Sequence, residues 1–319
     1  MKKVFAAIAA ASLLAVSACG GSGDEAGGES LRKVRFGYIA DYNGTSLLAV
    51  AGDQKLWAKH GLEPDAKVFT NGPLQITAMN AGDLDYGYIG PGAVWLPASG
   101  KAKIVSLNSL GNADRVIAQP GITGLAQLKG KKIGVPEGTS GDMILTLALR
   151  KAGLTNDDVE RVPMEPATIV TAFAAGQIDA AGIWYPLLGT IKQRTPDLVE
   201  LAENADFADQ MAFPTAFVAG NDVAADRTAA VREVLREAMD YRAAHPDETV
   251  QLVAAMNKQT VDAVKADAAN SRMLDAKTVD GYVSDGTVAK WLTGMGSYFV
   301  GAGKLPSNPE PSTYYLGLP

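Results

Sequence analysis

Short runs of alternating apolar and polar residues recur along the chain, and longer runs with helical spacing follow them. The first such pair is a strand predicted over 34–40, "VRFGYIA", and a helix predicted over 46–60 that ends at the glycine of "KHGL". Further strands are predicted over 66–70, 84–90 and 102–110, with short helices over 73–82 and 93–99. Strands that alternate with helices predict parallel β-α-β units.

The same pattern restarts near residue 131. Strands are predicted over 131–136, 159–164 and 178–184, with helices over 140–151 and 167–176. One more strand, 217–222, precedes helices over 226–244, 247–256, 259–266 and 276–301, and 304–319 reads as a loop. The restart suggests two α/β units in one chain.

Three internal echoes support two similar units. "TAMNAGDLDYGYIG" (77–90) aligns without a gap on "TAFAAGQIDAAGIW" (171–184), an offset of 94 residues. The two Gly-Thr-Ser triplets, 44–46 and 138–140, share that offset, and "KHGL" and "KAGL" differ by 92. Convergent β-α-β composition would also place glycines at helix ends, but the shared register favours paired lobes.

Composition narrows the function. A chain of 319 residues is long enough for two domains, and a net charge of −6 argues against a nucleic-acid partner, which would need clustered Lys and Arg. The chain has two histidines and one cysteine, so no zinc-ligand spacing is present. We therefore expect neither a metal site nor a cofactor.

The N-terminus predicts export and anchoring. Residues 1–18 combine two lysines, an apolar run too short to span a membrane and small residues before Cys19, which resembles the lipobox of bacterial lipoproteins. An ordinary secretory signal with a stray cysteine is the alternative. The glycine-rich, acidic segment 19–30 reads as a flexible tether. We expect an extracytoplasmic protein held at the cell membrane by a lipid on Cys19.

The triplet at 138–140 is a candidate anion site. The first turn of a helix leaves N–H groups unpaired at the positive end of the helix dipole, and hydroxyls add donors. Plain capping is the alternative, because Asp142 lies three residues after Thr139 as in a capping box. Gly141, a second glycine beyond what a cap needs, favours a ligand role there, whereas 44–46 fits capping.

Enzyme signatures are lacking. "GTSGD" is not the G-x-S-x-G nucleophile elbow, because Asp142 stands where the second glycine belongs. His60 and His245 occupy ordinary positions at helix ends, and neither a phosphate-binding P-loop nor a dinucleotide-binding G-x-G-x-x-G motif occurs. The sequence therefore favours a binding protein over an enzyme.

Together these stretches resemble the substrate-binding proteins of bacterial ABC importers of the taurine, alkanesulfonate and nitrate group. The resemblance is carried by "NGPLQITAMNAGDLDYGYIGPGAVWLPASG", "LGNADRVIA", "LAQLKGKKIGVPEGTSGDMILTLALRKAGL", "ATIVTAFAAGQIDAAGIWYPLL" and "FPTAFVAGND". It implies an α/β fold of two lobes, each a mixed, mostly parallel sheet flanked by helices, with the ligand in the cleft between them. Lobe one would be 31–117 plus 217–319, and lobe two 118–216, joined by two crossing strands.

The resemblance also implies the site. Gly138, Thr139 and Ser140 would hold an anionic group, and Gly90, Pro91 and Gly92 would meet it from the other lobe. Both Gly-Thr-Ser helix starts would face the cleft, so that hinge closure satisfies both around one anion.

Further residues carried over by the resemblance concern the remainder of the ligand. Trp184 matches an aromatic wall, with core packing as the alternative, and Thr215 lies in "FPTAF". Asp114 in "GNAD" matches an acid that meets the ammonium of taurine, while Phe217 stands near where relatives carry a second acid. Asp41 and Tyr42 lie in a loop expected to line the cleft.

The implied function is capture of a small organic anion, such as taurine or an alkanesulfonate, by a monomer that delivers it to a permease and its ATPase subunits. Nitrate, a vitamin or pyrimidine precursor, or an extracytoplasmic enzyme on the same scaffold are the alternatives. Because the second acid is missing near Phe217, we expect amine-free sulfonates to bind at least as tightly as taurine.

Overall fold

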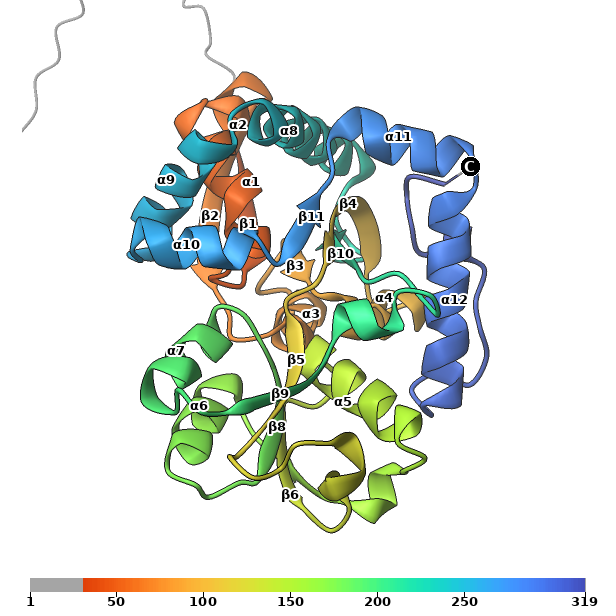
Figure 1. Cartoon of the computed structure of the whole chain (residues 1–319). Helices are drawn as coiled ribbons and strands as arrows, with labels where there is room; N and C mark the ends of the chain where they lie inside the picture. The colour runs from red at the N-terminus through yellow and green to blue at the C-terminus, as the bar shows by residue number, and fades with distance from the viewer. Residues whose placement is uncertain (1–30, 319) are drawn as a thin grey trace, which may run out of the picture. The chain divides into compact units, whose positions relative to one another are not determined.

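The computed structural model describes residues 31–318, which contain two mixed β-sheets flanked by helices (Figure 1). The predicted signal segment, Cys19 and the tether lie outside the described residues. Within 31–318, no helix combines the length and the apolar character needed to cross a membrane. The two-sheet α/β architecture confirms the predicted fold class.

The first sheet has six strands in the order β11-β4-β10-β3-β1-β2. Their bounds are Arg32–Tyr38 (β1), Leu62–Val68 (β2), Tyr86–Ile89 (β3), Lys103–Gly111 (β4), Pro214–Ala219 (β10) and Ser271–Met273 (β11). Strand β1 pairs in parallel with β2 and β3, and β10 is antiparallel to β3 and β4. Strands β1 to β4 thus run in one direction, as a mostly parallel sheet requires.

The second sheet has five strands in the order β7-β6-β8-β5-β9. Their bounds are Asp114–Ala118 (β5), Lys132–Val135 (β6), Glu160–Pro163 (β7), Ala180–Trp184 (β8) and Val199–Glu203 (β9). Parallel pairs join β6 to β7 and β8, and β5 is antiparallel to β8 and β9. The order and directions repeat those of β2, β1, β3, β10 and β4.

Helices connect and cover the strands of both sheets (Figure 1). The α-helices are Tyr42–Asp53 (α1), Leu56–Lys59 (α2), Gly72–Asn80 (α3), Trp95–Ala98 (α4), Ser140–Lys151 (α5), Pro166–Ala174 (α6), Leu187–Arg194 (α7), Ala225–Ala244 (α8), Pro246–Asn257 (α9), Val261–Ala268 (α10), Ala276–Ser284 (α11) and Thr287–Gly301 (α12). Short 3-10 turns are Pro91–Ala93, Leu125–Leu128, Asn156–Asp158, Asn204–Phe207 and Pro311–Thr313. Helices α8 and α9 pack against α1, and α5 packs against β5 and β8.

The predicted internal repeat is confirmed for one helix and the strand that follows it in each half. Helices α3 and α6 both begin and end 94 residues apart, and so do the starts of β3 and β8. Gly82 and Gly176, which follow these helices, both adopt left-handed φ angles of 79° and 66°. Glycine fits both positions because a side chain would be strained there.

The prediction that the two Gly-Thr-Ser triplets start equivalent helices is wrong. Helix α1 begins at Tyr42 with Asp41 as its N-cap, so Gly44-Thr45-Ser46 lies inside the helix. In the second sheet Thr139 is itself the N-cap and Ser140 opens α5. The predicted helix 46–60 is also two helices, separated at Lys55, which adopts a left-handed φ of 56°.

The predicted lobe boundaries are corrected by strand pairing. Strand β5 begins at Asp114 and pairs in the second sheet, so the chain changes sheet just after Gly111 and not at 117. It returns with β10, which begins at Pro214 and not at 217. Local periodicity could not locate these crossings, because β4 and β5 are two consecutive buried strands with only a short polar break.

Other differences are local. The predicted helix 276–301 is divided into α11 and α12 at Gly286, whose φ is 79°. Strands β5, β9 and β11 and helix α7 were not predicted as elements from the sequence.

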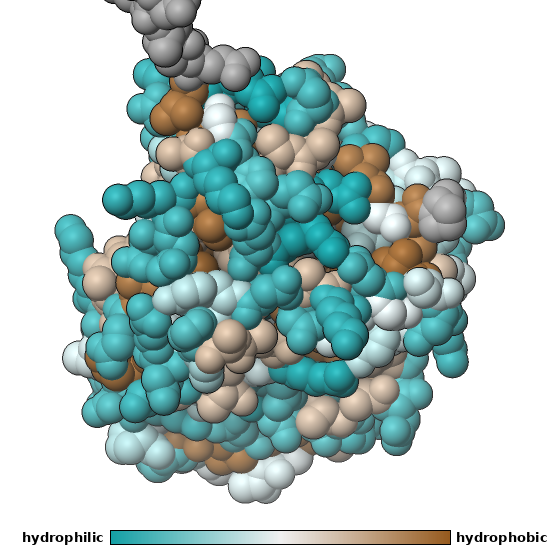
Figure 2. Space-filling model, turned by 90° about the horizontal axis from the view of Figure 1, so that it is seen from above, coloured by the Kyte–Doolittle hydropathy of each residue, from teal (hydrophilic) through white to brown (hydrophobic). Residues whose placement is uncertain are grey.

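The central strands of both sheets lie in the core. Strands β5, β8 and β10 are buried along their whole length, as expected for strands covered on both faces. Viewed from above, the surface is mainly polar, with apolar side chains in small patches (Figure 2). Large exposed apolar side chains within 31–318 are scattered, namely Leu31, Val68, Leu74, Val300 and Leu316.

Candidate functional site

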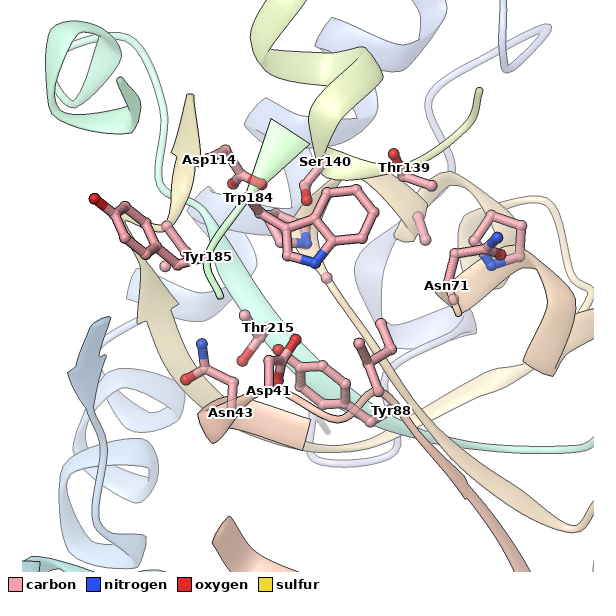
Figure 3. A pocket seen from close by; sticks show the side chains of 18 residues that line it. Asp41, Asn43, Asn71, Tyr88, Asp114, Thr139, Ser140, Trp184, Tyr185 and Thr215 are labelled. Atoms are coloured by element: carbon pink, nitrogen blue, oxygen red, sulfur yellow. The ribbon is translucent and has the colours of Figure 1, made fainter. Parts of the chain in front are cut away.

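A cavity lies where the strand ends of the two sheets face each other (Figure 3). Its walls come from the loops after β1, β2, β3 and β6, the β4–β5 crossing, and the ends of β8 and β10. Ligands of open α/β sheets bind at the carboxyl ends of parallel strands, so this is the expected position for a site. The cavity volume is about 40 Å³, which suits a small solute.

Most of the candidate residues line this one cavity. The eight that do so are Asp41, Gly90, Pro91, Asp114, Thr139, Ser140, Trp184 and Thr215. Their role in ligand binding stays a prediction, but the structure brings together residues up to 174 positions apart in the sequence. The other three, Tyr42, Gly92 and Gly138, do not line it.

Each of the three exceptions has a physical reason. Tyr42 is buried against valines of α9 and α10, because the first turn of α1 points it away from the cavity. Gly92 packs so tightly on the backbone of Thr139 and Ser140 that an added Cβ would overlap it. Gly138 accepts a hydrogen bond from Trp95 Nε1 at 3.3 Å. Both glycines therefore seal the junction between the two halves.

Sequence reasoning missed ten lining residues. They are Ile39, Asn43, Asn71, Gly72, Pro73, Tyr88, Ala93, Gly111, Ala113 and Tyr185. Several could have been found from their place directly after a strand, since Asn71 follows β2 and Tyr185 follows β8.

Asp41 is a buried acid in the cavity wall. It is 6% exposed, and its carboxylate accepts the backbone N–H of Gly44 at 2.6 Å, which caps α1. Burial raises the pKa of Asp41 well above its usual value, with a further contribution from Asp267. The N-terminus of α1 is therefore already occupied by an acidic side chain of the protein.

Asp114 is the second buried acid and lies near Ser140 and Trp184 in the cavity wall (Figure 3). It is 4% exposed and accepts a hydrogen bond from Asn204 Nδ2 at 3.0 Å. Burial raises the pKa of Asp114, while hydrogen bonds from the Ser140 and Asn204 side chains and the charge of Arg115 work in the opposite direction. The Ser140 hydroxyl, at the start of α5, is therefore used by a carboxylate of the protein.

The remaining groups at the start of α5 bond locally. The Thr139 hydroxyl donates to the carbonyl of Pro136 at 2.5 Å, and no side chain caps the helix through Thr139. The capping box considered for Thr139 and Asp142 is therefore absent. Asp142 instead accepts the N–H of Gly138 at 2.8 Å and pairs with Arg161 at 2.5 Å.

A polar network fixes the floor of the cavity. Thr215 and Asn43, which line the cavity, both bond to Ser109, at 2.8 and 2.9 Å. Asn108 donates to the carbonyl of Asn43 at 2.9 Å and accepts from Arg242 Nη1 at 2.7 Å. Arg242, 1% exposed, thus organises this floor from behind without lining the cavity.

Aromatic side chains form the other walls. Trp184 and Tyr88 lie on opposite sides of the space in Figure 3, with Tyr185 to one side. The hydroxyl of Tyr185 accepts from Lys192 Nζ at 2.9 Å, and the Arg115 guanidinium lies 5.7 Å from its ring centroid. Such rings can enclose a flat or cationic group.

The cavity is closed by contacts between the two halves. Besides the contact of Gly92, Thr70 Oγ1 donates to Glu165 at 3.0 Å, and Lys304 pairs with Asp142 at 3.4 Å. Arg150 on α5 donates to the carbonyl of Gly301 at 2.8 Å. The structure therefore represents a closed arrangement, in which the lining residues are buried or partly buried.

The charged residues that line the cavity are all acidic. Of the residues in 31–318 that form the cavity wall, two are acids and none is Lys, Arg or His. No group of three or more potential metal ligands occurs in the described part of the chain. An enclosed site with acids, amides and aromatic rings is suited to binding a small solute.

Two α/β halves that close over such a cavity form a scaffold suited to holding a small molecule between them. The family profile described as NMT1/THI5-like matches residues 45–249. The chain belongs to the NMT1/THI5-like family. The resemblance to ABC-importer binding proteins is thereby confirmed, and the chain stands among binding proteins and not enzymes.

Three relatives illustrate the range of similarity. A Brucella abortus (strain 2308) protein, whose name describes it as a candidate binding protein, is 54% identical over 89% of this chain and 90% of its own length. The taurine-binding periplasmic protein of Escherichia coli (strain K12) is 28% identical over 45% of this chain and 46% of its own. The solved alkanesulfonate-binding protein of Xanthomonas axonopodis pv. citri, bound to MOPS, has a TM-score of 0.69 at 21% identity, covering 89% of this chain and 97% of that one.

Proposed function

We propose that this chain is the extracytoplasmic receptor of an ABC importer for a small solute that carries a protonated nitrogen. The observation that carries this proposal is the presence of Asp41 and Asp114 in the wall of one closed cavity without a basic lining residue. The receptor closes around the solute and delivers it to a permease coupled to ATPase subunits.

The charge argument is physical. Burying a carboxylate without a partner is unfavourable, and a cation in the cavity would offset that penalty. An anion would be repelled by the same two acids. It would also find the helix start of α1 occupied by Asp41, and the Ser140 hydroxyl at the start of α5 bonded to Asp114.

The acidic cavity wall changes the ligand that we expect. The expectation that amine-free sulfonates bind at least as tightly as taurine assumed that no second acid is present. Asp41 lies in the cavity wall and supplies that acid from β1's loop, although Phe217 occupies the position near which relatives carry one. We therefore propose that an amine or a protonated ring nitrogen is the group recognised.

A zwitterion is the second candidate. Thr139 and Ser140 line the cavity at the start of α5, where the helix dipole favours negative charge. A ligand such as taurine could place its ammonium near the acids and its sulfonate near this helix. Relatives named for taurine and aliphatic sulfonates support this candidate.

Three matched two-carbon compounds test the proposal: ethylammonium, taurine and ethanesulfonate. Calorimetric titration should show that ethylammonium and taurine bind more tightly than ethanesulfonate. Asp41→Asn and Asp114→Asn should each lower the affinity for ethylammonium by about 10- to 100-fold, since a hydrogen bond to a charged group contributes about 1.5–3 kcal/mol. Asp280→Asn, far from the cavity on α11, is the control. Tightest binding of ethanesulfonate would refute the proposal.

We also propose that Cys19 carries a lipid that holds the receptor at the membrane, and that the receptor acts as a monomer. The lipobox-like sequence supports the anchor, and one chain supplies every residue of the cavity wall. Cys19→Ala should release the protein from membranes with ligand affinity unchanged. A variant that stays membrane-bound would exclude the anchor, and a dimer in light scattering would exclude the monomer.

A further inference from the structure

Two carboxylates converge on the first turn of α1. Asp41 accepts the N–H of Gly44, and Asp267, from the end of α10, accepts the N–H of Tyr42; both distances are 2.6 Å. Asp41 is 6% exposed and Asp267 is 3% exposed. Each acid satisfies a different N–H of the first turn, so the start of α1 holds two buried carboxyls side by side.

These two acids have no cationic partner. No Lys, Arg or His nitrogen in 31–318 lies within ion-pair distance of Asp41 or Asp267. The buried cation on the neighbouring helix α8, Arg242, is bonded to Ser46, Asn108 and the carbonyl of Leu274. Two adjacent buried carboxylates without counter-charge cannot readily both ionise.

We propose that Asp267 is a specificity-determining residue that does not touch the ligand: with Asp41 it holds one proton in the empty cavity, and this proton leaves to bulk water when a cation binds beside Asp41. The proposal rests on the proposed function for the charge of the ligand. The pair would then carry one negative charge when the cavity is empty and two when a cation is bound, so release of the proton strengthens the attraction for the cation. Asp267 thereby contributes to selection for positive charge from behind the cavity wall.

The neighbouring groups are consistent with this. Burial raises the pKa of Asp267 to about 7, and burial followed by the charge of Asp267 raises the pKa of Asp41. The tyrosines that face the pair, Tyr42 and Tyr88, have raised pKa values because of burial, so they remain neutral. Asp114 also acts on Asp41, but it has its own donors in Ser140 and Asn204.

The pH dependence has a defined sign. Asp267 has a folded-state pKa above the ordinary 3.8, so its contribution to stability is present at low pH and is lost as pH rises toward about 7. Affinity for a cation should rise over the same interval, because less work is needed to remove the proton. Above that interval the affinity should level off.

The first experiment needs no ligand. Carboxyl carbons of ¹³C-labelled aspartate are followed by NMR as pH is raised in the wild type, Asp267→Asn and Asp280→Asn. We expect a buried carboxyl that titrates near neutral pH in the wild type and in Asp280→Asn. In Asp267→Asn the midpoint of Asp41 should fall. If both Asp41 and Asp267 titrate in the ordinary range of about 3–5, the proposal is wrong.

The second experiment measures protons released on binding. Ethylammonium is titrated near pH 6.5 in buffers of different ionisation enthalpy, whose slope reports the proton count. A substantial fraction of one proton should leave the wild type, and almost none should leave Asp267→Asn. Equal release from both proteins would overturn the role of Asp267.

The two experiments separate two kinds of failure. If ethylammonium does not bind, the proposed function fails, but the NMR titration still tests the shared proton. If Asp267→Asn does not fold, Asp41→Asn serves instead, because asparagine is an equally good N-cap. In that variant Asp267 loses its charged neighbour, so its midpoint should fall; an unchanged midpoint would refute the coupling.

Discussion

The two halves of the molecule have the same strand order but different helix starts at the cavity. In the first half, α1 is capped by Asp41 and receives Asp267 as well. In the second half, α5 begins after Thr139, whose hydroxyl turns back to Pro136, and the acid Asp142 points away from the cavity toward Arg161. The two halves therefore share a topology, but the acid at the start of α1 lines the cavity, whereas the acid in the first turn of α5 forms an ion pair away from it.

The difference arises from what packs behind each helix. Helix α1 is covered by α8, α9 and α10, and Thr45, Asn43 and Tyr42 bond to Asn257, Ser271 and Asp267 of that C-terminal segment. The start of α5 instead meets Lys304 and the loop around Gly92 from the other half. An acid with a basic partner stabilises the closed form, whereas an acid without one is available for a ligand.

The largest expected effect contrasts the two acids. Asp142→Asn should lower the free energy of unfolding by about 3 kcal/mol, because Arg161 loses its buried partner. The net effect of its surroundings lowers the pKa of Asp142: burial opposes this, and Arg161 and the Gly138 N–H cause it. The difference from wild type should therefore shrink as pH falls below 3.8.

The matched variant is Asp41→Asn. It should keep its stability at neutral pH, because asparagine still caps α1 and the substitution leaves no basic side chain without its partner. Urea unfolding at several pH values measures both proteins. Equal losses of stability in the two variants would show that the acids serve the same structural purpose.

The next effect concerns the junction between the halves. Gly92→Ala places a Cβ against the backbone of Thr139 and Ser140, so the halves cannot close fully. Affinity for ethylammonium should fall about 10- to 100-fold, or about 1.4–2.8 kcal/mol, with little change in melting temperature. Gly189→Ala, in α7 with open space around it, is the control and should leave affinity unchanged. Unchanged affinity in Gly92→Ala would mean that closure does not govern binding.

A smaller effect separates the two identical triplets. Ser46→Ala removes a hydrogen bond from Arg242 in the core and should lower stability by about 1 kcal/mol without affecting the cavity wall directly. Ser140→Ala removes a donor to Asp114 and should mainly change ligand affinity, by a few-fold. Thermal melts and calorimetry on both variants measure the contrast. It would be refuted if both serines changed the same property.

The smallest effect is expected at the exposed edge of the junction. Lys304→Met removes a partly exposed ion pair with Asp142, and such pairs contribute about 0.2–1 kcal/mol. Ligand dissociation should accelerate by no more than a few-fold, and salt should produce a similar change in the wild type. Lys290→Met, on the preceding helix α12, is the control. Stopped-flow dissociation rates measure the effect, and a rate equal to that of the control would exclude a role in closure.

Local sequence patterns accounted for much of the architecture. The alternation of apolar runs predicted most strands, and the echo at an offset of 94 correctly related α3 and β3 to α6 and β8. Candidates next to strand ends, such as Pro91 and Ser140, lie around one cavity because parallel strands end at the same edge of a sheet. These features depend on near neighbours in the chain, which the sequence displays directly.

The tertiary structure alone decided the chemistry of the site. The echo between Gly-Thr-Ser triplets misled because helix starts depend on capping, and Asp41 lies three residues earlier than the triplet. Whether Asp41 is buried, paired or coupled depends on Asp267, 226 positions later in the chain. The pKa of a carboxyl is set by desolvation and by nearby charge, and both come from segments that only folding brings together.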